Sequence, residues 1–287
     1  MTESPIAEYG TDLLRTSIGA HGSGFLWRRR PGPLAPSPFV TGDYPFTHVA
    51  HVDDVRLVPG RDDGPARVYE VRGQRSVARV LLREGPRADL TVPLRGMGAL
   101  LRALHEQRAP ALAEPRGIVR LRDWLSGCAG TQRASDAYRF ALDGLGSART
   151  AVLADLCVRI SSDDHPVLSH GAPSLGSLAV GDDPRAADLL VGEDLCAAPW
   201  YFDVGWVVGE LVELQCVRGV DASGWEALIQ AFLDGYGRDL GSEWSLLASM
   251  RIMLHLHDYT AYVAWRPEEF TRYLHLLAFL IDSCPGS

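Results

Sequence analysis

The sequence predicts an α+β protein of two lobes, in which a small antiparallel sheet is followed by a larger and mostly helical part. Apolar and polar side chains alternate in several segments between residues 46 and 107, as they do in half-buried strands. Later segments repeat apolar residues at steps of three and four, which is typical of helices packed on a core. With 287 residues, of which 46% are apolar, the chain is long enough to bury such a core.

The first 45 residues are expected to form an arm or extension. After a short helical pattern they become rich in Pro and Gly, beginning at Arg28-Arg29-Arg30-Pro31-Gly32-Pro33 and continuing through Pro45. Such a composition suits an extended or wrapped segment better than a core element. We favour a solvated arm with one docked aromatic side chain, Trp27, over a segment that binds a partner.

The first lobe is expected over residues 46–112. The predicted strands are residues 54–58, 66–71 and 75–82, with Gly-containing turns between them. Leucines at core spacing predict one helix from Leu94 to Glu106. Between the first two strands, the turn Gly60–Ala66 carries two acids, so a plain hairpin is favoured there over a phosphate-binding loop. The pattern breaks at residues 108–116, which predicts the lobe boundary.

The second lobe is expected over residues 113–287 and mostly helical, except for a strand-rich patch from about residue 166 to 195. The predicted helices are residues 135–145, 150–160, 203–217, 225–237, 246–263 and 267–281. His255 and His257 lie on the fifth of these helices, two residues and therefore about 200° apart. They face opposite ways, so helical surface or core positions are favoured over a metal-ligand pair.

Composition excludes several classes of function. The net charge of −8 argues against a general nucleic-acid binder and weakly favours a cationic or basic peptide partner. No apolar run is long enough to cross a membrane, and the first residues do not resemble a signal peptide, so we expect a cytoplasmic protein. The five cysteines show no C-x-x-C spacing, which signals neither a disulfide framework nor a zinc site. All 28 basic residues are Arg, so no Lys can clamp a phosphate.

One loop carries a family resemblance. His170-Gly171-Ala172, four further residues, Ser177 and the apolar run Leu178-Ala179-Val180 resemble the catalytic loop of the aminoglycoside phosphotransferase and choline kinase family, which reads His-Gly-Asp, four spacers, Asn and a short apolar strand. Three later segments match the family's order, namely Asp188–Asp194, Tyr201–Leu211 and Ala231–Tyr236. The similarity covers about residues 65 to 240 and implies the two-lobed protein-kinase-like fold.

The resemblance also implies that the usual chemistry is missing. In this family the Asp at position 172 positions the attacking hydroxyl, the Asn at 177 holds a second metal, and the Asp at 191 is the main metal ligand. This chain has Ala172, Ser177 and Val191. Phosphoryl transfer depends on metal ions that neutralise the developing charge, and Mg²⁺ requires oxygen ligands. An isopropyl group cannot supply one.

The other residues of the expected nucleotide site match the family pattern only in part. Arg79 falls where the family places its phosphate-clamping Lys or Arg, so a phosphate or anion contact is expected there. The helix that should supply its acidic partner reads Leu94-Arg95-Gly96-Met97-Gly98 and contains no acid. Glu193 and Asp194 lie beside the lost metal position and are the candidates for a relocated metal site, although exposed turn acids are the commoner explanation.

The scaffold residues of the loop are kept. His170 braces the catalytic loop in the resembling family, and Asp203 anchors it from the base of the following helix. Their retention beside Ala172 and Val191 indicates that the shape of the loop still matters, unless the scaffold persists only because the lobe cannot fold otherwise.

The leading hypothesis is therefore a pseudokinase of bacterial, in particular actinobacterial, natural-product or peptide-modification metabolism. It would bind a small molecule or peptide in the interlobe cleft, or serve as a partner subunit of another enzyme, with no cofactor of its own. One alternative is an active phosphotransferase that uses ATP and Mg²⁺ with relocated metal ligands. Its substrate would be a small molecule, an antibiotic, or Ser/Thr of a peptide as in class V lanthionine synthetases. Another alternative is a cleft repurposed for a non-phosphoryl reaction.

Overall fold

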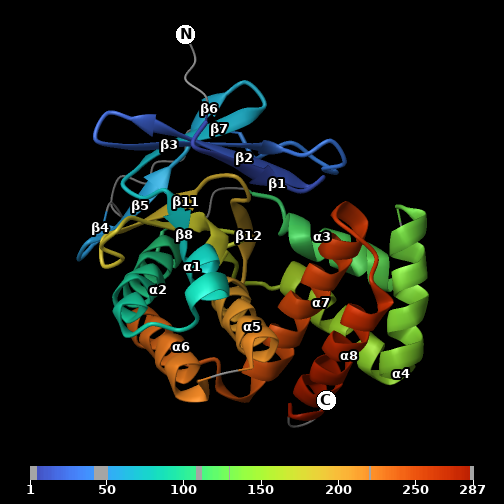
Figure 1. Ribbon diagram of the computed structural model, residues 1–287. Helices are drawn as coiled ribbons and strands as arrows, with labels where there is room; N and C mark the ends of the chain where they lie inside the picture. Colours follow the sequence, from blue (N-terminus) through green and yellow to red (C-terminus); the bar gives the residue numbers. More distant parts are fainter. Residues whose placement is uncertain (1–4, 42–50, 108–111, 129, 220, 285–287) are drawn as a thin grey trace.

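The N-terminal sheet forms the upper layer of the molecule (Figure 1). The computed structural model describes residues 5–41, 51–107, 112–128, 130–219 and 221–284. Five strands of the N-terminal sheet pair antiparallel in the order β1-β2-β3-β7-β6. They are β1 (Ala7–Gly10), β2 (Leu14–His21), β3 (Gly24–Pro31), β7 (Ala66–Val71) and β6 (Arg61–Asp63).

The prediction of an N-terminal arm is wrong for residues 7–31, because they form three strands of this sheet. The inward positions do alternate: Thr16 and Ile18 are buried on β2, and Trp27 and Arg29 on β3. A charged residue at one inward position and the neighbouring run of prolines conceal this period in the sequence. Residues 42–50, which include Pro45, lie outside the described part of the chain.

A central sheet lies between the N-terminal sheet and the helices (Figure 1). Its order is β4-β5-β11-β10-β8, and β5 pairs parallel to β11 with Leu57 opposite Leu189. The strands are β4 (His51–Val52), β5 (Val55–Pro59), β8 (Arg75–Ser76), β10 (Leu178–Val180) and β11 (Ala187–Val191). The separate pair β9 (Val167–Ser169) and β12 (Cys196–Ala198) flanks the loop that follows β9. The predicted strand-rich patch is therefore present.

The predicted strand over residues 75–82 ends at Ser76, where helix α1 (Val77–Glu84) begins. The Ser76 hydroxyl accepts a hydrogen bond from the Arg79 amide at 3.2 Å and so caps the helix. Val77, Val80 and Leu81 are buried at helical spacing. Over such a short segment, β-branched residues at 77 and 80 fit a strand equally well, and the cap decides between the two structures.

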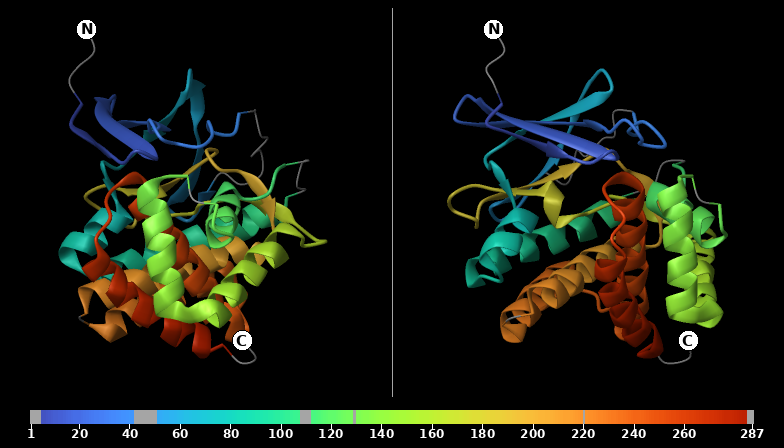
Figure 2. Two further views of the ribbon diagram at one scale, coloured as in Figure 1. Left: turned by 90° about the vertical axis from the view of Figure 1, so that its right-hand side faces the viewer. Right: turned by 45° about the vertical axis from the view of Figure 1, so that its right-hand side comes forward.

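The helical part lies below the two sheets in all views (Figures 1 and 2). Its helices are α2 (Thr91–His105), α3 (Arg116–Leu125), α4 (Gln132–Ser161), α5 (Trp200–Arg218), α6 (Ala222–Tyr236), α7 (Trp244–Tyr262) and α8 (Pro267–Asp282). Three short 3₁₀ turns complete the described elements at Ala88–Leu90, Leu175–Ser177 and Gly241–Glu243. Helix α3 was not predicted, and α4 joins two predicted helices across a break at Gly146, where φ is 79°.

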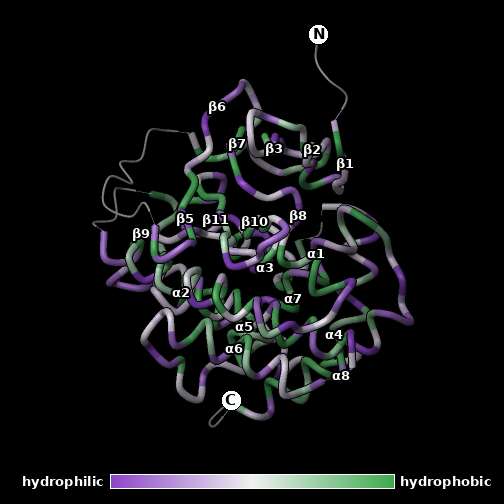
Figure 3. Tube along the Cα trace, turned by 60° about the vertical axis from the view of Figure 1, so that its left-hand side comes forward, coloured by the Kyte–Doolittle hydropathy of each residue, from purple (hydrophilic) through white to green (hydrophobic). Residues whose placement is uncertain are grey.

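Apolar side chains of the central sheet and of the helices form one large core. Hydrophobic segments alternate with hydrophilic ones along the helices, as expected for helices with one buried face (Figure 3). A smaller cluster around Trp27 lies between the two sheets. None of the helices in the described ranges is both long and apolar enough to cross a lipid bilayer.

Helix α2, expected in the first lobe, packs mainly against α6 of the helical part. Two glycines permit this contact. A Cβ at Gly98 would lie 2.2 Å from the carbonyl oxygen of Phe232, and one at Gly235 would lie 1.9 Å from that of Arg95. The acid-free stretch at residues 94–98 therefore serves close helix packing and does not lie beside a cation of the N-terminal sheet.

This crossing predicts a stability effect. Substituting Gly98→Ala should lower the free energy of unfolding by about 2 kcal/mol, because backbone atoms of α6 cannot give way to the new methyl group. The loss should appear although Ala gains about 1 kcal/mol over Gly inside a helix. Urea unfolding followed by circular dichroism measures it. Gly19→Ala is the control, since a Cβ there meets nothing within 4 Å; equal midpoints for the two variants would contradict the packing argument.

Candidate functional site

The loop after β9 is held by a carboxylate at the start of α5. Asp203 is fully buried, and its two oxygens accept hydrogen bonds from the backbone amides of His170, at 2.7 Å, and Gly171, at 3.1 Å. The His105 ring nitrogen Nε2 lies 3.0 Å from the same carboxylate. The structure thus brings together His170 and Asp203, the two predicted scaffold residues, while His105 was not predicted.

The His170 ring ties the loop to the central sheet. Its Nε2 lies 2.7 Å from the Leu190 carbonyl oxygen, so this nitrogen carries the proton and donates it. Gly171 has φ of 87°, and a Cβ there would lie 1.8 Å from the Asp194 carbonyl oxygen. A glycine is required at this position both for its backbone conformation and for the close approach.

A second carboxylate of α5 holds the other end of the loop. Glu210 accepts hydrogen bonds from the Leu175 amide at 3.0 Å and from the Ser174 hydroxyl at 3.3 Å. Burial raises the pKa of Glu210, although Arg251 nearby opposes this effect. Sequence reasoning missed Glu210. Its spacing of seven residues from Asp203, which places both acids on one face of a helix, was the available signal.

The three degenerate positions meet in one small cavity between the two parts of the molecule. Ala172, Ser177 and Val191 all line it, and its volume is about 190 Å³. Ser177 is buried and its hydroxyl accepts a hydrogen bond from Arg29 at 3.0 Å, while Val191 is buried at the end of β11. The structure therefore brings these three positions together, and none of them carries a carboxylate.

The basic residue of the N-terminal sheet that faces this cavity is Arg29 on β3. Its guanidinium lies 3.3 Å from the Glu193 carboxylate, which also accepts a hydrogen bond from the Tyr69 hydroxyl at 2.8 Å. Burial lowers the pKa of Arg29, but the neighbouring Glu193, Tyr69, Tyr9 and Asp194 together outweigh burial and raise it. Burial raises the pKa of Glu193, and Arg29 opposes this effect. Sequence reasoning had placed Arg29 in the arm.

Arg79, the predicted anion contact, does not line the small cavity. It is an exposed residue of helix α1 rather than of a strand, and it lines a second and larger cavity. No acid of α2 faces it, and its side chain has no ion pair or hydrogen bond within the described ranges. A role in binding an anion remains a prediction.

The remaining acids of the small cavity are each paired with an arginine. Asp194 accepts a hydrogen bond from the Arg116 Nε at 2.8 Å, and Asp258 lies 2.7 Å from Arg120. Arg120 and a hydrogen bond from His257 hold the pKa of Asp258 well below its usual range in spite of burial. Glu193 is buried, so its interpretation as an exposed turn acid is wrong. In the part of the chain that the structure describes, no group of three or more His, Cys, Asp or Glu residues is arranged to hold a metal.

Comparison with solved structures shows which known proteins share this architecture. Aminoglycoside phosphotransferase APH(4)-Ia matches over 99% of this chain and 94% of its own, with a TM-score of 0.55 and 10% identity. APH(3'')-Id from Streptomyces rimosus matches over 96% and 92%, with a TM-score of 0.49 and 14% identity. An ethanolamine kinase of Plasmodium vivax matches over 94% and 78%, with a TM-score of 0.48 and 13% identity.

Sequence comparison adds nothing to these matches: no protein-family model matches the chain, and no curated protein matches it significantly. At 10% identity the likeness to APH(4)-Ia shows the fold alone. The predicted α+β architecture is confirmed, and the chain has the protein-kinase-like fold of the aminoglycoside phosphotransferases.

Proposed function

We propose that this protein is a non-catalytic member of the phosphotransferase fold, a pseudokinase that binds a small molecule or a peptide between its two lobes. The main observation in support is the small cavity. Ala172, Ser177 and Val191 line it together, and each acid in its lining is paired with an arginine. A setting in natural-product or peptide modification, alone or as a partner subunit, is the corresponding expectation from the sequence resemblance.

Charge argues against a metal at Glu193. A divalent cation bound there would lie beside the buried guanidinium of Arg29, which is 3.3 Å from the carboxylate. Two like charges at such short range in a partly desolvated site repel each other strongly. Mg²⁺ also needs several oxygen ligands, and the neighbouring Asp194 is bonded to Arg116. Metal binding would therefore require two ion pairs to break.

Protein atoms also fill the space beside the lost metal positions. Trp27 is fully buried between the two sheets, in a cluster with Ala179 and Leu190. These two residues lie two positions after Ser177 and one position before Val191 in the chain. The indole fills the apolar space between the two sheets. The missing metal ligands thus argue against the ordinary reaction of the fold.

The test is calorimetric titration of the protein with ATP, with and without Mg²⁺, together with an assay of phosphate release and transfer. We expect no Mg²⁺-dependent affinity and no turnover. The positive control is the thermostable mutant of APH(4)-Ia, whose structure has been solved with AMP-PNP and hygromycin B.

Mg²⁺-dependent binding with turnover would overturn the proposal in favour of an active phosphotransferase. In that case Glu193→Ala and Asp194→Ala identify the relocated metal ligands, because they should abolish turnover, whereas Asp155→Ala on the exposed face of α4 should not.

A further inference from the structure

A second cavity, of about 990 Å³, opens beside the small one between the N-terminal sheet and the helices. Strands β1 and β2 line one side of it, and helices α1 and α7 line another. Arg29, Ser174 and Asp258 line both cavities. The two spaces therefore belong to one interlobe cleft.

Two arginines of α1 face this cavity without a counterion. Arg79 and Arg83 are one helical turn apart, both are exposed, and both line the cavity. Neither side chain has an ion pair or hydrogen bond with the described residues. Most other arginines of the described chain are paired with a carboxylate, as Arg56 is with Asp188. Two neighbouring guanidinium groups without a carboxylate partner are thus unusual in the described part of this molecule.

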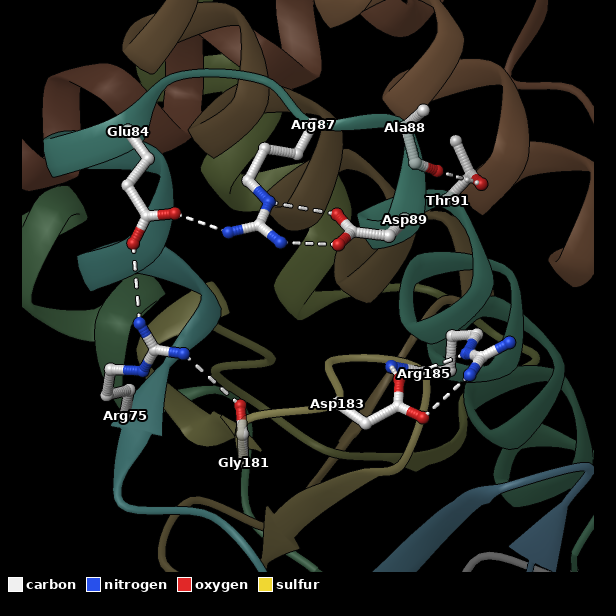
Figure 4. A network of polar contacts seen from close by, with 9 residues as sticks. All are labelled: Arg75, Glu84, Arg87, Ala88, Asp89, Thr91, Gly181, Asp183 and Arg185. Atoms are coloured by element: carbon white, nitrogen blue, oxygen red, sulfur yellow. Dashed lines mark hydrogen bonds and ion pairs between the residues drawn. The ribbon is translucent and has the colours of Figure 1, made fainter.

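The nearest acid on the same helix does not neutralise them. Glu84 is bonded to Arg75, at 3.3 Å, and to Arg87, which is also held by Asp89 (Figure 4). Successive helical residues are about 100° apart, so Glu84 projects to a different side of α1 from Arg79 and Arg83. Glu84 is therefore engaged by Arg75 and Arg87, and the cavity face of α1 keeps the positive charge of Arg79 and Arg83.

The charges that line the cavity nearly balance apart from this pair. Asp258 is bonded to Arg120, His255 to Glu213, and Arg29 to Glu193, so these groups are already neutralised. Glu8 is the remaining acid in the lining. The excess of positive charge in the cavity lining is small, which suits a ligand with one or two negative charges and disfavours a triphosphate.

Apolar side chains cover another part of the cavity wall. Tyr9, Leu82 and Val263 are 45%, 49% and 44% exposed, and all three line it. Large apolar side chains that gather exposed at one concave site mark a binding surface. Leu82 is one turn from Arg79 on α1 and lines the same cavity, so charge and apolar surface adjoin there.

We propose that this cavity binds an amphipathic anion, a molecule with an apolar body and a single carboxylate or phosphate group that Arg79 and Arg83 hold together. The proposal rests on the proposed function, since it names the ligand class of the same cleft. Guanidinium groups bind carboxylate and phosphate oxygens through charge-assisted hydrogen bonds, and the apolar body would cover Tyr9, Leu82 and Val263.

The experiment compares four probes by calorimetry: dodecanoate, dodecyl phosphate, dodecyltrimethylammonium and inorganic phosphate. The wild-type protein should bind one or both anionic amphiphiles, and the preferred head group distinguishes a carboxylate from a phosphate ligand. In the double variant Arg79→Gln/Arg83→Gln the affinity should fall by roughly tenfold or more, because two charge-assisted contacts are lost. Arg61→Gln/Arg272→Gln is the control, with the same change in net charge at two exposed arginines that do not line the cavity.

Equal affinity in the two double variants would overturn the proposal, as would binding of the cationic amphiphile as tight as that of the anions, or no binding at all. Tighter binding of Mg²⁺-free ATP than of either amphiphile would overturn the amphipathic anion in favour of a polyanion. These outcomes are independent of turnover. If the protein neither turns over ATP nor binds the anions, the proposed function stands and the amphipathic-anion inference fails. If it turns over ATP and also binds the anions, the proposed function fails and the inference stands.

Discussion

Replacing Trp27 by alanine is expected to lower the free energy of unfolding by about 3–5 kcal/mol, as for other large buried aromatic side chains. The side chain has no exposed surface and packs with Ile18, Tyr69 and Val71 of the N-terminal sheet. It also contacts the cluster residues of β10 and β11, so it joins the two sheets. The loss should be large because backbone strands on both sides prevent the cavity from collapsing.

A second variant separates packing from hydrogen bonding. The indole Nε1 donates a hydrogen bond to the Gly73 carbonyl oxygen at 2.9 Å. Trp27→Phe keeps most of the apolar contact but leaves this buried carbonyl unpaired, so we expect a loss of about 1–3 kcal/mol. Urea unfolding followed by fluorescence and circular dichroism gives both values. Trp244→Ala, at a tryptophan that is 40% exposed, is the control and should cost about 1 kcal/mol; a similar loss in Trp27→Ala would refute a structural role for the indole.

The helical part was predictable because its signal is local. Amphipathic spacing located most of the long helices to within a few residues, and Gly146 explains why α4 was predicted as two. The sheets were harder. The parallel pairing of β5 with β11 joins residues such as Leu57 and Leu189, and no local pattern encodes such a partner. The strands of the supposed arm were missed because Arg29 interrupts an otherwise alternating pattern.

The candidate site divides along the same line. The motif around His170 located the loop, and the family resemblance pointed to Asp203, whose carboxylate accepts a hydrogen bond from the His170 amide. The partners of the acids could not be predicted, since Arg29 reaches Glu193 and Arg116 reaches Asp194 only through the packing of separate elements. Such long-range ion pairs leave no periodic trace in a sequence. Arg79 was expected on a strand and lies on helix α1, where it lines the larger cavity, and its contact with an anion stays a prediction.

Replacing Asp203 by alanine should lower the free energy of unfolding by about 3 kcal/mol and release the His170 loop. The substitution leaves two buried backbone amides, those of His170 and Gly171, without their acceptor, and each such loss costs about 1–3 kcal/mol. The effect should extend to the small cavity, because the loop carries Ala172. Hydrogen exchange measured by mass spectrometry should show faster exchange over residues 169–177 than in the wild-type protein.

The matched control is Asp155→Ala, an exposed acid on α4 with no side-chain bond in the described structure, which should change stability by less than about 0.5 kcal/mol. If Asp203 serves only the stability of the lobe, exchange should rise throughout α5 as much as in the loop. If it holds the shape of the cleft, the increase should centre on the loop while the rest of α5 stays protected. An Asp203→Ala protein with wild-type stability and wild-type exchange in the loop would contradict both roles. The Asp203 carboxylate contacts the amides of His170 and Gly171 and the His105 ring, and an alanine side chain can make none of these contacts.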